Sequence, residues 1–316
     1  MRIYDPAKTR VLVLKGGWTS ERDISLQGAA AVEKGLKAAG FRVSCLDIKN
    51  RVSVRSLFDR KFDVAFIVLH GKFGEDGGIQ AVLDGMGVPY TGSGVLASAL
   101  AMNKIFSKQI FDFAKVPTPK WQVLCKDKAS PGLKIPLPVV IKPSQQGSAI
   151  GVSIVERKKE FQPAVKKAFS YDEQAVVEEY IGGREVSVGI LDKKALAVIE
   201  LRPKRKFYDY KAKYTQGLCH HIVPAPLPFG MYRKVQELAL RAHNALGCRG
   251  YSRVDMKIDG EEIYVFEVNT IPGMVDVSLL PESARAEGIG FTQLLKNMVE
   301  LALPLRNRGR RKEVKA

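Results

Sequence analysis

The chain has 316 residues, 46% of them hydrophobic, and carries 50 Lys and Arg against 33 Asp and Glu, a formal net charge of +17. This length exceeds what one small core can hold and predicts two or three domains. The longest apolar runs fall far short of the roughly 18 residues of a membrane-spanning helix, and the N-terminus lacks a secretory hydrophobic segment, so we expect a cytoplasmic protein with no membrane partner.

The four cysteines lie far apart and show neither a CxxC pair nor a Cys/His metal spacing. We therefore expect them to pack as small apolar side chains, without a disulfide framework. The positive charge keeps nucleic-acid binding open as an alternative function. Part of this charge lies in a basic run at 306–316, which we expect to be a mobile tail, and the other Lys and Arg are dispersed as on a solvated surface.

The N-terminal part reads as repeated strand and helix units. A β-branched run at Arg10–Leu14 ends at two glycines and precedes a helical pattern from Leu26 to Ala39. Similar strands are expected at Arg42–Leu46 and Val64–Leu69. This alternation predicts a parallel sheet whose loops gather at the carboxyl ends of the strands.

Two polar residues follow the first and third of these strands, Glu21 and His70. Loops at the same edge of a parallel sheet can bring them to one crevice, although either alone also fits an ordinary polar loop residue. A dinucleotide-binding function is excluded, because the glycines after the first strand lack the GxGxxG spacing and no acidic residue follows at the ribose position.

A Gly/Pro-rich strand and turn at Gly85–Gly94 is expected to end the first domain. A helix from Val95 to Phe113 follows and carries Lys104. Two strands within Pro136–Val155 then flank a loop of small residues, with Lys142 at the end of the first strand. Such a loop can close over a triphosphate while the lysine supplies positive charge, although many surface hairpins have a similar tip.

The next segment, Ala175–Leu191, predicts two strands joined through a Gly-Gly pair. Its acidic residues Glu178, Glu179 and Glu185 could meet the adenine and ribose of a nucleotide. The sequence FYDYKAKY at 207–214 is both aromatic and basic, which fits nucleic-acid stacking or a mobile lid over an active site. His220 and His221 lack partners at ligand spacing, and we expect them at the surface.

After a helix from Tyr232 to Leu246, residues Arg253–Gly273 alternate apolar and polar on both sides of an Asp-Gly turn signal. This pattern predicts an antiparallel hairpin. A loop of roughly four or five residues would set Asp255 opposite Phe266 or Glu267. A final helix near 291–301 is expected to complete the last domain.

One face of this hairpin would carry Arg253, Asp255, Glu267 and Asn269, since side chains on a strand repeat every second residue. Two carboxylates and an amide oxygen suit a hard cation such as Mg²⁺, which often arrives with phosphate oxygens. A solvated polar face is the plain alternative. The following NTIPG turn frees backbone N–H groups that can hold an oxyanion, which favours the functional interpretation.

These motifs together resemble one family. The segments GGWTSERDIS, LHGKFGEDG, PYTGSG, KPSQQGSAIG, FYDYKAKY, RVDM and EVNTIPGM occur in the order found in D-alanine:D-alanine ligases of the ATP-grasp superfamily. Any one of them is a weak pattern, but their ordered succession over about 300 residues is not expected by chance.

The resemblance implies a mixed α/β and α+β fold, the ATP-grasp, with a parallel-sheet domain followed by two β-rich domains that clamp ATP. The implied boundaries are 1–94 for the N-terminal domain, 95–180 for the central domain, 181–305 for the C-terminal domain and 306–316 for the basic tail. The implied reaction joins two D-alanines through an acyl phosphate for peptidoglycan synthesis. It requires ATP and Mg²⁺, two ions of it, with Mn²⁺ as an alternative, in a homodimer that binds no specific nucleic acid.

The resemblance also assigns roles to residues by motif position. Glu21 holds the first substrate's ammonium and is linked through Ser148 to Tyr214 on the lid, and His70 faces the reacting phosphate. The implied nucleotide contacts are Lys104, Lys142, Glu178, Glu179, Ile181, Glu185 and Lys213. The implied metal ligands are Asp255, Glu267 and Asn269, the groups that stabilise the tetrahedral intermediate are Arg253 and the N–H of Gly273, and the second substrate's carboxylate meets Ser278 and Leu279.

The sequence departs from the family pattern at a few positions. Asn103 stands where Asp is usual, a change we expect to be tolerated. Ile271, Val275 and Asp276 replace small polar residues, and Asp276 would bring a negative charge towards the incoming carboxylate. Tyr214 favours an amino acid over D-lactate as second substrate, because ligases that make the depsipeptide resemble one another in lacking this tyrosine.

Overall fold

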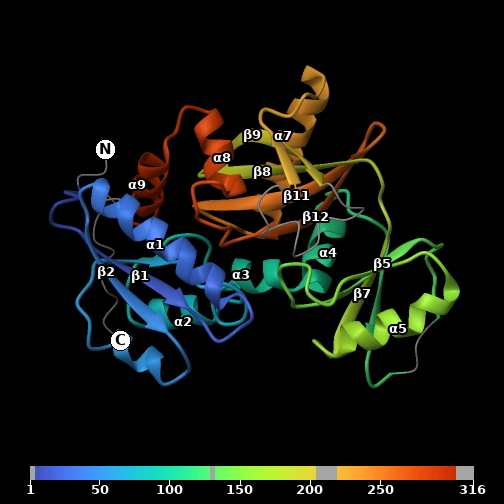
Figure 1. Cartoon of the computed structure of the whole chain (residues 1–316), viewed down its shortest axis with the longest axis horizontal. Coiled ribbons are helices and arrows are strands. Elements are labelled where there is room, and N and C mark those ends of the chain that lie inside the picture. Colours follow the sequence, from blue (N-terminus) through green and yellow to red (C-terminus); the bar gives the residue numbers. More distant parts are fainter. Residues whose placement is uncertain (1–3, 129–131, 204–218, 304–316) are drawn as a thin grey trace, which may run out of the picture.

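The computed structural model describes residues 4–128, 132–203 and 219–303. Its first part is a parallel sheet in the order β2-β1-β3, which confirms the predicted N-terminal architecture (Figure 1). The elements are β1 (Arg10–Gly16), α1 (Arg22–Ala38), β2 (Arg42–Ile48), the 3-10 turn η1 (Ser53–Leu57), β3 (Val64–Ile67) and α2 (Gly78–Gly85). The predicted strand within 85–94 is wrong: only a single bridge joins Tyr90 to Ala65 in this stretch.

The predicted helix from Val95 to Phe113 forms two helices, α3 (Val95–Met102) and α4 (Lys104–Phe113). The break lies at Asn103, whose backbone is extended. Its side-chain oxygen accepts hydrogen bonds from the backbone N–H groups of Ile105 at 3.0 Å and Phe106 at 3.3 Å. Asn and Asp serve almost equally as N-caps, so the structure explains why Asn is suitable at this position.

The central part is an antiparallel sheet in the order β4-β7-β5-β6. Its elements are β4 (Trp121–Cys125), β5 (Val139–Pro143), β6 (Ser153–Val155), α5 (Lys158–Phe169) and β7 (Gln174–Glu179). Alternate residues such as Val139, Ile141 and Val177 pack under α5. Because side chains alternate along a strand, Lys142 and Glu178 point to the opposite face, away from α5.

The C-terminal part contains a second antiparallel sheet, which within the described residues has the order β10-β9-β8-β11-β12. Its elements are β8 (Arg184–Leu191), β9 (Lys194–Pro203), β10 (Cys219–Ile222), α7 (Phe229–Ala245), β11 (Tyr251–Asp259), β12 (Glu262–Asn269), α8 (Leu279–Ala286) and α9 (Phe291–Ala302). Although β7 and β8 are joined by only a short Gly-Gly segment, they belong to different sheets. The chain therefore passes from one sheet to the other at 180–183.

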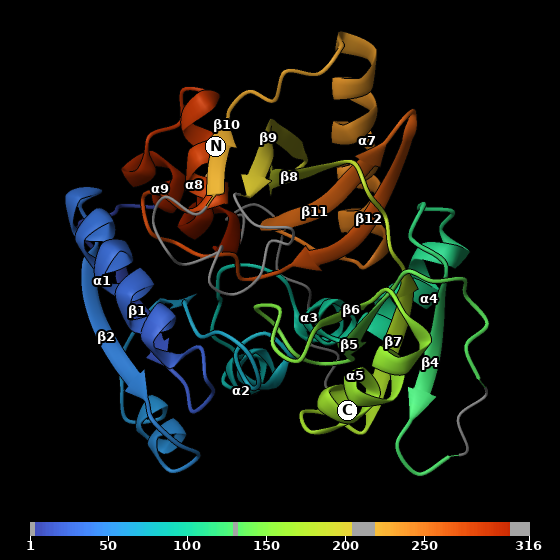
Figure 2. The same ribbon diagram turned by 45° about the vertical axis from the view of Figure 1, so that its right-hand side comes forward.

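The last helix packs against both the C-terminal and the N-terminal parts of the chain. Helix α9 lies against α1, and its Leu295 joins the same buried core as Val11 and Val32 of the N-terminal part (Figures 1 and 2). Gly35 of α1 permits this contact, since a Cβ there would lie only 2.5 Å from Leu295. The two ends of the chain thus share one core, which fixes the first sheet against the C-terminal part.

The hairpin formed by β11 and β12 has the predicted register, reached in a different way. Asp259 pairs with Glu262, so the loop has two residues rather than four or five. A bulge between Asp255 and Met256 then shifts the pairing by one residue and leaves Phe266 without a partner. The extra residue sets Asp255 opposite Glu267, as the polar pattern required.

Candidate active site

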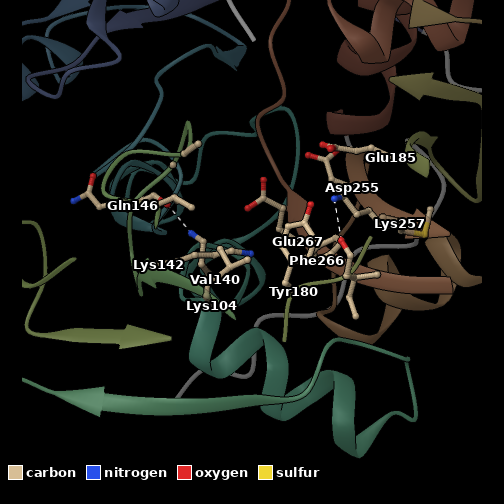
Figure 3. A pocket seen from close by; sticks show the side chains of 15 residues that line it. Lys104, Val140, Lys142, Gln146, Tyr180, Glu185, Asp255, Lys257, Phe266 and Glu267 are labelled. Atoms are coloured by element: carbon tan, nitrogen blue, oxygen red, sulfur yellow. Dashed lines mark hydrogen bonds between the residues drawn. The ribbon is translucent and has the colours of Figure 1, made fainter. Parts of the chain in front are cut away.

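A pocket, here called the sheet pocket, lies between the central and C-terminal sheets (Figure 3). The start of α4, the central sheet and its β5–β6 loop contribute Lys104, Val140, Lys142, Gln146, Gly147, Ala149 and Val152. The opposite wall has Tyr180, Ile181, Glu185, Asp255, Met256, Lys257, Phe266 and Glu267. Figure 3 shows the lysines of one wall facing the carboxylates of the other. A concave pocket that combines apolar side chains with a few charged groups is typical of a small-molecule site.

Two predicted phosphate contacts lie together on the central wall. The Lys104 ammonium donates to the backbone carbonyl of Gln146 at 2.6 Å, which ties the start of α4 to the loop between β5 and β6. Lys142 lies on β5, with its Nζ 5.0 Å from the centre of the Phe266 ring across the pocket. Phe266, the residue that the bulge leaves unpaired, thus places its ring beside the Lys142 ammonium.

The opposite wall contains a lysine that the sequence did not single out. Lys257 lies directly across from Glu185 in the pairing of β11 with β8. Its ammonium donates to the carbonyl of Ile181 at 3.1 Å. Burial lowers the pKa of Lys257, with the nearby Glu185 carboxylate opposing that shift. Its position two residues after Asp255, on the same strand face, was the available signal.

The two predicted adenine carboxylates are placed differently from Glu185. Among the described residues, neither Glu178 nor Glu179 lines the sheet pocket. Glu178 is only 1% exposed and accepts a hydrogen bond from Lys142 at 2.6 Å. It lies behind the pocket wall, where it contacts the lysine that the pocket exposes.

The predicted polar face of the hairpin is present. Arg253 donates to both carboxylate oxygens of Asp255, from Nε at 2.8 Å and from Nη2 at 2.7 Å. The Ser187 hydroxyl and the Asn269 amide also donate to Asp255, at 2.7 and 3.1 Å. Ser187 is a partner that the sequence gave no reason to select.

The donor set on this face fits a hard cation. Asp255 and Glu267 are paired across the hairpin, and Asn269 lies two residues further on the same face. No cluster of three or more His, Cys, Asp or Glu suited to a metal occurs in the part of the chain that the structure describes, and this set has only two such residues. A cation here would require Arg253 to release an oxygen of Asp255, because that carboxylate is already saturated with donors.

A second pocket, here called the junction pocket, lies where all three parts of the chain meet and shares Glu267 with the sheet pocket. Its lining contains nine residues predicted from the sequence: Glu21, His70, Ser148, Arg253, Glu267, Asn269, Gly273, Ser278 and Leu279. They come from loops of the first sheet, the β5–β6 loop, the hairpin and the turn before α8. The structure therefore brings the predicted substrate residues together.

The predicted link between Glu21 and Ser148 is also present. Glu21, at the start of α1, is 7% exposed and accepts a short hydrogen bond from the Ser148 hydroxyl. Ser148 has a positive φ of 52° in the loop between β5 and β6. The bond joins the N-terminal part to the central loop over the pocket. The third member of the link, Tyr214, lies outside the described residues, as do Lys213 and the whole FYDYKAKY segment.

His70 lies in the wall of the junction pocket, 7% exposed. Its Nδ1 is 3.8 Å from Glu75, and its buried Nε2 has no hydrogen-bond partner among the described residues. Burial lowers the pKa of His70, but the carboxylates of Glu75 and Glu21 outweigh it and the net shift is upward. A buried, unpartnered ring nitrogen in a pocket is suited to meet an anionic ligand.

The turn before α8 is held by its own side chains. The Val275 N–H donates to the Ser278 hydroxyl at 3.2 Å, and the Ser278 N–H donates to the Val275 carbonyl at 2.8 Å. Asp276 is paired with Arg285 on α8, with 67% of its side chain exposed. Within the described residues, Asp276 lines neither pocket, so its charge is directed away from the place where we expected it.

His221 is not a simple surface residue as predicted. It lies on β10, lines the junction pocket, and contacts Glu282 of α8 through Nδ1 at 2.7 Å. Hydrogen bonds with Cys219 and Glu282, opposed by burial, raise the pKa of His221 to about 9. Its partner lies 61 residues away, so no local pattern could reveal it.

Comparison with known proteins agrees with this geometry. Residues 51–93 match the family model described as D-ala D-ala ligase N-terminus, and residues 110–300 match D-ala D-ala ligase C-terminus. Within the described residues, no helix has the length and apolar character needed to span a membrane.

The chain is similar to the D-alanine–D-alanine ligase of Geotalea uraniireducens, with 52% identity over 302 residues that cover 94% of this chain and 97% of the relative. The corresponding enzyme of Citrifermentans bemidjiense is 47% identical over 305 residues, 96% and 99% of the two chains. The crystal structure of the Bacillus anthracis ligase complexed with ATP superposes with a TM-score of 0.84 at 32% identity, covering 93% and 97%. By sequence and by fold, the chain belongs to the D-alanine–D-alanine ligase family.

Proposed function

We propose that this protein joins two D-alanines at the expense of ATP, through an acyl phosphate, and so supplies D-alanyl-D-alanine for peptidoglycan synthesis. The observation that carries the proposal is the pair of adjoining pockets that share Glu267. One pocket has the shape and lysines of a nucleotide site, and the other combines a buried carboxylate, an unpartnered histidine nitrogen and an arginine. The shared wall is where a γ-phosphate and a substrate carboxylate would meet.

The proposed reaction has two steps. A carboxylate oxygen of the first D-alanine attacks the γ-phosphorus of ATP, and ADP leaves. The free amine of the second D-alanine then attacks the acyl carbon, loses a proton, and expels inorganic phosphate. Both steps bring anionic groups together, so positioning and positive charge account for most of the catalysis.

The junction pocket supports these roles for the chain's own residues. Glu21, held by Ser148, would bind the ammonium of the first D-alanine. Arg253 and the N–H of Gly273 would stabilise the oxyanion that forms when the amine attacks. The buried Nε2 of His70 would face the transferring phosphate. Ser278 and Leu279 would bind the carboxylate of the second D-alanine, beside the pair formed by His221 and Glu282.

The sheet pocket supports nucleotide binding. Lys104 and Lys142 would contact the phosphates, Ile181 would border the adenine just beyond the strand that carries Glu178 and Glu179, and Glu185 would bind the ribose. Lys213 and Tyr214 stay predictions from the sequence, because they lie outside the described residues.

The fit of two carboxylates and an amide to a hard cation supports Mg²⁺ as the metal, with two ions expected and Mn²⁺ as a substitute. Asp255, Glu267 and Asn269 would hold it. When bound, it would supply positive charge between the nucleotide phosphates and the substrate carboxylate. Release of an Asp255 oxygen by Arg253 would at the same time make the guanidinium available to the substrate, which links the two roles of this face.

The position of Asp276, paired with Arg285, supports D-alanine as second substrate, because that carboxylate does not repel the incoming one. The family further supports a homodimer in the cytoplasm. The change of sheet at 180–183 supports the proposed boundary between the central domain, 95–180, and the C-terminal domain, 181–305.

The proposal is tested by phosphate release with ATP, Mg²⁺ and a panel of second substrates, with the product identified by mass. We expect release to require D-alanine, and the product to have the mass of D-alanyl-D-alanine. Faster turnover with D-lactate or an L-amino acid would keep the ATP-grasp chemistry and overturn the substrate. ATP hydrolysis that proceeds without any amino acid would overturn the ligase.

A further inference from the structure

A buried lysine lies behind the sheet pocket, and none of the roles above uses it. Lys108 follows Lys104 by one turn of α4, so the two side chains lie on the same helix face. Lys104 reaches the pocket, whereas Lys108 is 0% exposed and among the largest fully buried side chains of the described residues. A fully buried lysine is costly unless its charge is compensated, which indicates a specific purpose.

Lys108 has two partners. Its ammonium donates to the Thr118 hydroxyl at 2.7 Å and lies 3.3 Å from the Oε1 of Glu178. The Thr118 hydroxyl itself donates to the carbonyl of Val265 on β12 at 2.8 Å, so it offers its lone pair to the lysine. This leaves Glu178 as the one anion in direct contact with Lys108 within the described residues.

Glu178 is thereby shared between two lysines. Its Oε2 accepts a hydrogen bond from Lys142 at 2.6 Å, while its Oε1 faces Lys108. Of the three residues Lys108, Glu178 and Lys142, it is Lys142 that lines the sheet pocket, with 14% of its side chain exposed. The order Lys108, Glu178, Lys142 thus runs from the interior to the nucleotide site.

The charges of this row do not cancel. Two ammonium groups and one carboxylate leave a single net positive charge at the pocket wall. Burial raises the pKa of Glu178, but the two lysines outweigh burial and hold it below its usual value, so the carboxylate is ionised. Burial lowers the pKa of Lys108 against the attraction of Glu178.

We propose that Lys108 is a positioning residue for nucleotide binding: it neutralises Glu178 from the buried side, so that the charge of Lys142 remains available to the phosphates of ATP. Without Lys108, Glu178 and Lys142 would form a neutral pair, and the pocket wall would lose one positive charge. This inference rests on the proposed function, in which Lys142 contacts the nucleotide phosphates.

A purely structural role predicts something different. Through the Thr118 hydroxyl, Lys108 also connects α4 to the Val265 carbonyl on β12. Loss of this connection would distort the whole sheet pocket. Distortion would weaken the binding of any ligand that uses the adenine slot, whether or not it carries phosphates. The proposed charge effect would weaken only the ligands that carry phosphates.

The experiment is a double-mutant cycle of Lys108→Met, Glu178→Gln and the double variant, with ATP affinity measured by calorimetry and adenosine measured as a competitor of ATP in the phosphate-release assay. We expect Lys108→Met to weaken ATP about tenfold and to change the adenosine constant less than about twofold. In the Glu178→Gln background, Lys108 has lost the anion that compensates its burial and is expected to be neutral, so Lys108→Met should leave ATP affinity unchanged.

The double variant also protects the test against misfolding, because it leaves no uncompensated buried charge. Lys159→Met, on the exposed start of α5, removes one positive charge elsewhere and serves as the matched control. Equal loss of ATP affinity in both backgrounds, or equal loss of ATP and adenosine, would overturn the proposal. A parent enzyme that releases no phosphate with ATP and D-alanine would instead overturn the proposed function.

Discussion

The two pockets of the site are built in contrasting ways. The sheet pocket is lined by strand residues of two sheets together with the β5–β6 loop and the start of α4, and its charged groups are fixed by buried partners such as Glu178 behind Lys142. The junction pocket is lined mainly by loops from three parts of the chain, joined by single contacts such as the bond from Ser148 to Glu21. Under the proposed function, nucleotide binding would therefore depend on groups fixed within the sheets, and substrate binding on how the three parts of the chain come together.

Glu267, which lines both pockets, should show the largest effect. Glu267→Gln keeps the shape and removes one of two carboxylates from the proposed cation site. We expect turnover to fall by about a thousandfold, because several kcal/mol of transition-state stabilisation depend on that charge. Steady-state phosphate release over a range of Mg²⁺ measures it. Turnover within tenfold of the parent would contradict the proposed role of this carboxylate in holding the cation.

A buried histidine outside both pockets allows the stability of the fold to be tested separately from ligand binding. His243 on α7 is 2% exposed, and its Nδ1 lies 2.6 Å from the Ser252 hydroxyl. Burial lowers the pKa of His243 to about 4. The unfolded chain, with an ordinary histidine pKa, binds this proton first, so stability is lost as the pH falls from about 6.5 towards 4.

We therefore expect the free energy of unfolding to fall by about 2 kcal/mol between pH 7 and pH 5 through this residue. Urea unfolding at both values measures it, and His243→Gln should remove that part of the pH dependence. An unchanged pH dependence in the variant would place the sensitivity elsewhere. The result separates acid sensitivity of the fold from that of the junction pocket.

The variant Ser148→Ala removes the hydrogen bond that joins the β5–β6 loop to Glu21 of the N-terminal part. Loss of a charge-assisted hydrogen bond to a buried carboxylate costs about 1.5 to 3 kcal/mol, so we expect the KM for D-alanine to rise about tenfold or more. The KM for ATP should change little, since Ser148 does not line the sheet pocket. Initial rates at varied D-alanine and ATP measure both. Ser170→Ala, an exposed serine of the central part, is the control, and an equal rise in both constants would contradict the contrast.

The smallest effect is expected at the atypical residue of the α8 turn. Asp276→Asn removes a charge that is paired with Arg285 and largely exposed. Exposed ion pairs contribute little, so the KM for the second D-alanine should change by less than about twofold. Substrate saturation curves check it. A several-fold gain in affinity would show that this carboxylate does reach the junction pocket.

The sequence predicted the polar face of the hairpin because alternation is a local property, and the face formed although the loop length was wrong. The two-residue loop and the bulge that leaves Phe266 unpaired compensate for each other, a detail that the alternation does not determine. Asn103 illustrates the opposite case, since a residue known to cap helices was placed inside one continuous predicted helix.

The residues that the sequence missed depend on contacts between distant segments. Lys108 is 70 residues from Glu178, and His221 is 61 residues from Glu282, so neither partner follows from spacing. The same holds for α9, whose apolar face fits either the C-terminal or the N-terminal part until the packing against α1 is known. The residue types of the site could be predicted from local sequence patterns. The partners of buried charged groups and the packing of distant helices into one core could not.

The central claim, that a carboxylate and a γ-phosphate meet at the wall shared by the two pockets, is tested most directly by isotope transfer. D-alanine labelled with ¹⁸O in both carboxylate oxygens is incubated with ATP and Mg²⁺, and the released phosphate is analysed by mass spectrometry. The account predicts one ¹⁸O atom in each phosphate, because the acyl phosphate is cleaved at the acyl carbon. Phosphate without ¹⁸O, released while the dipeptide forms, would contradict it.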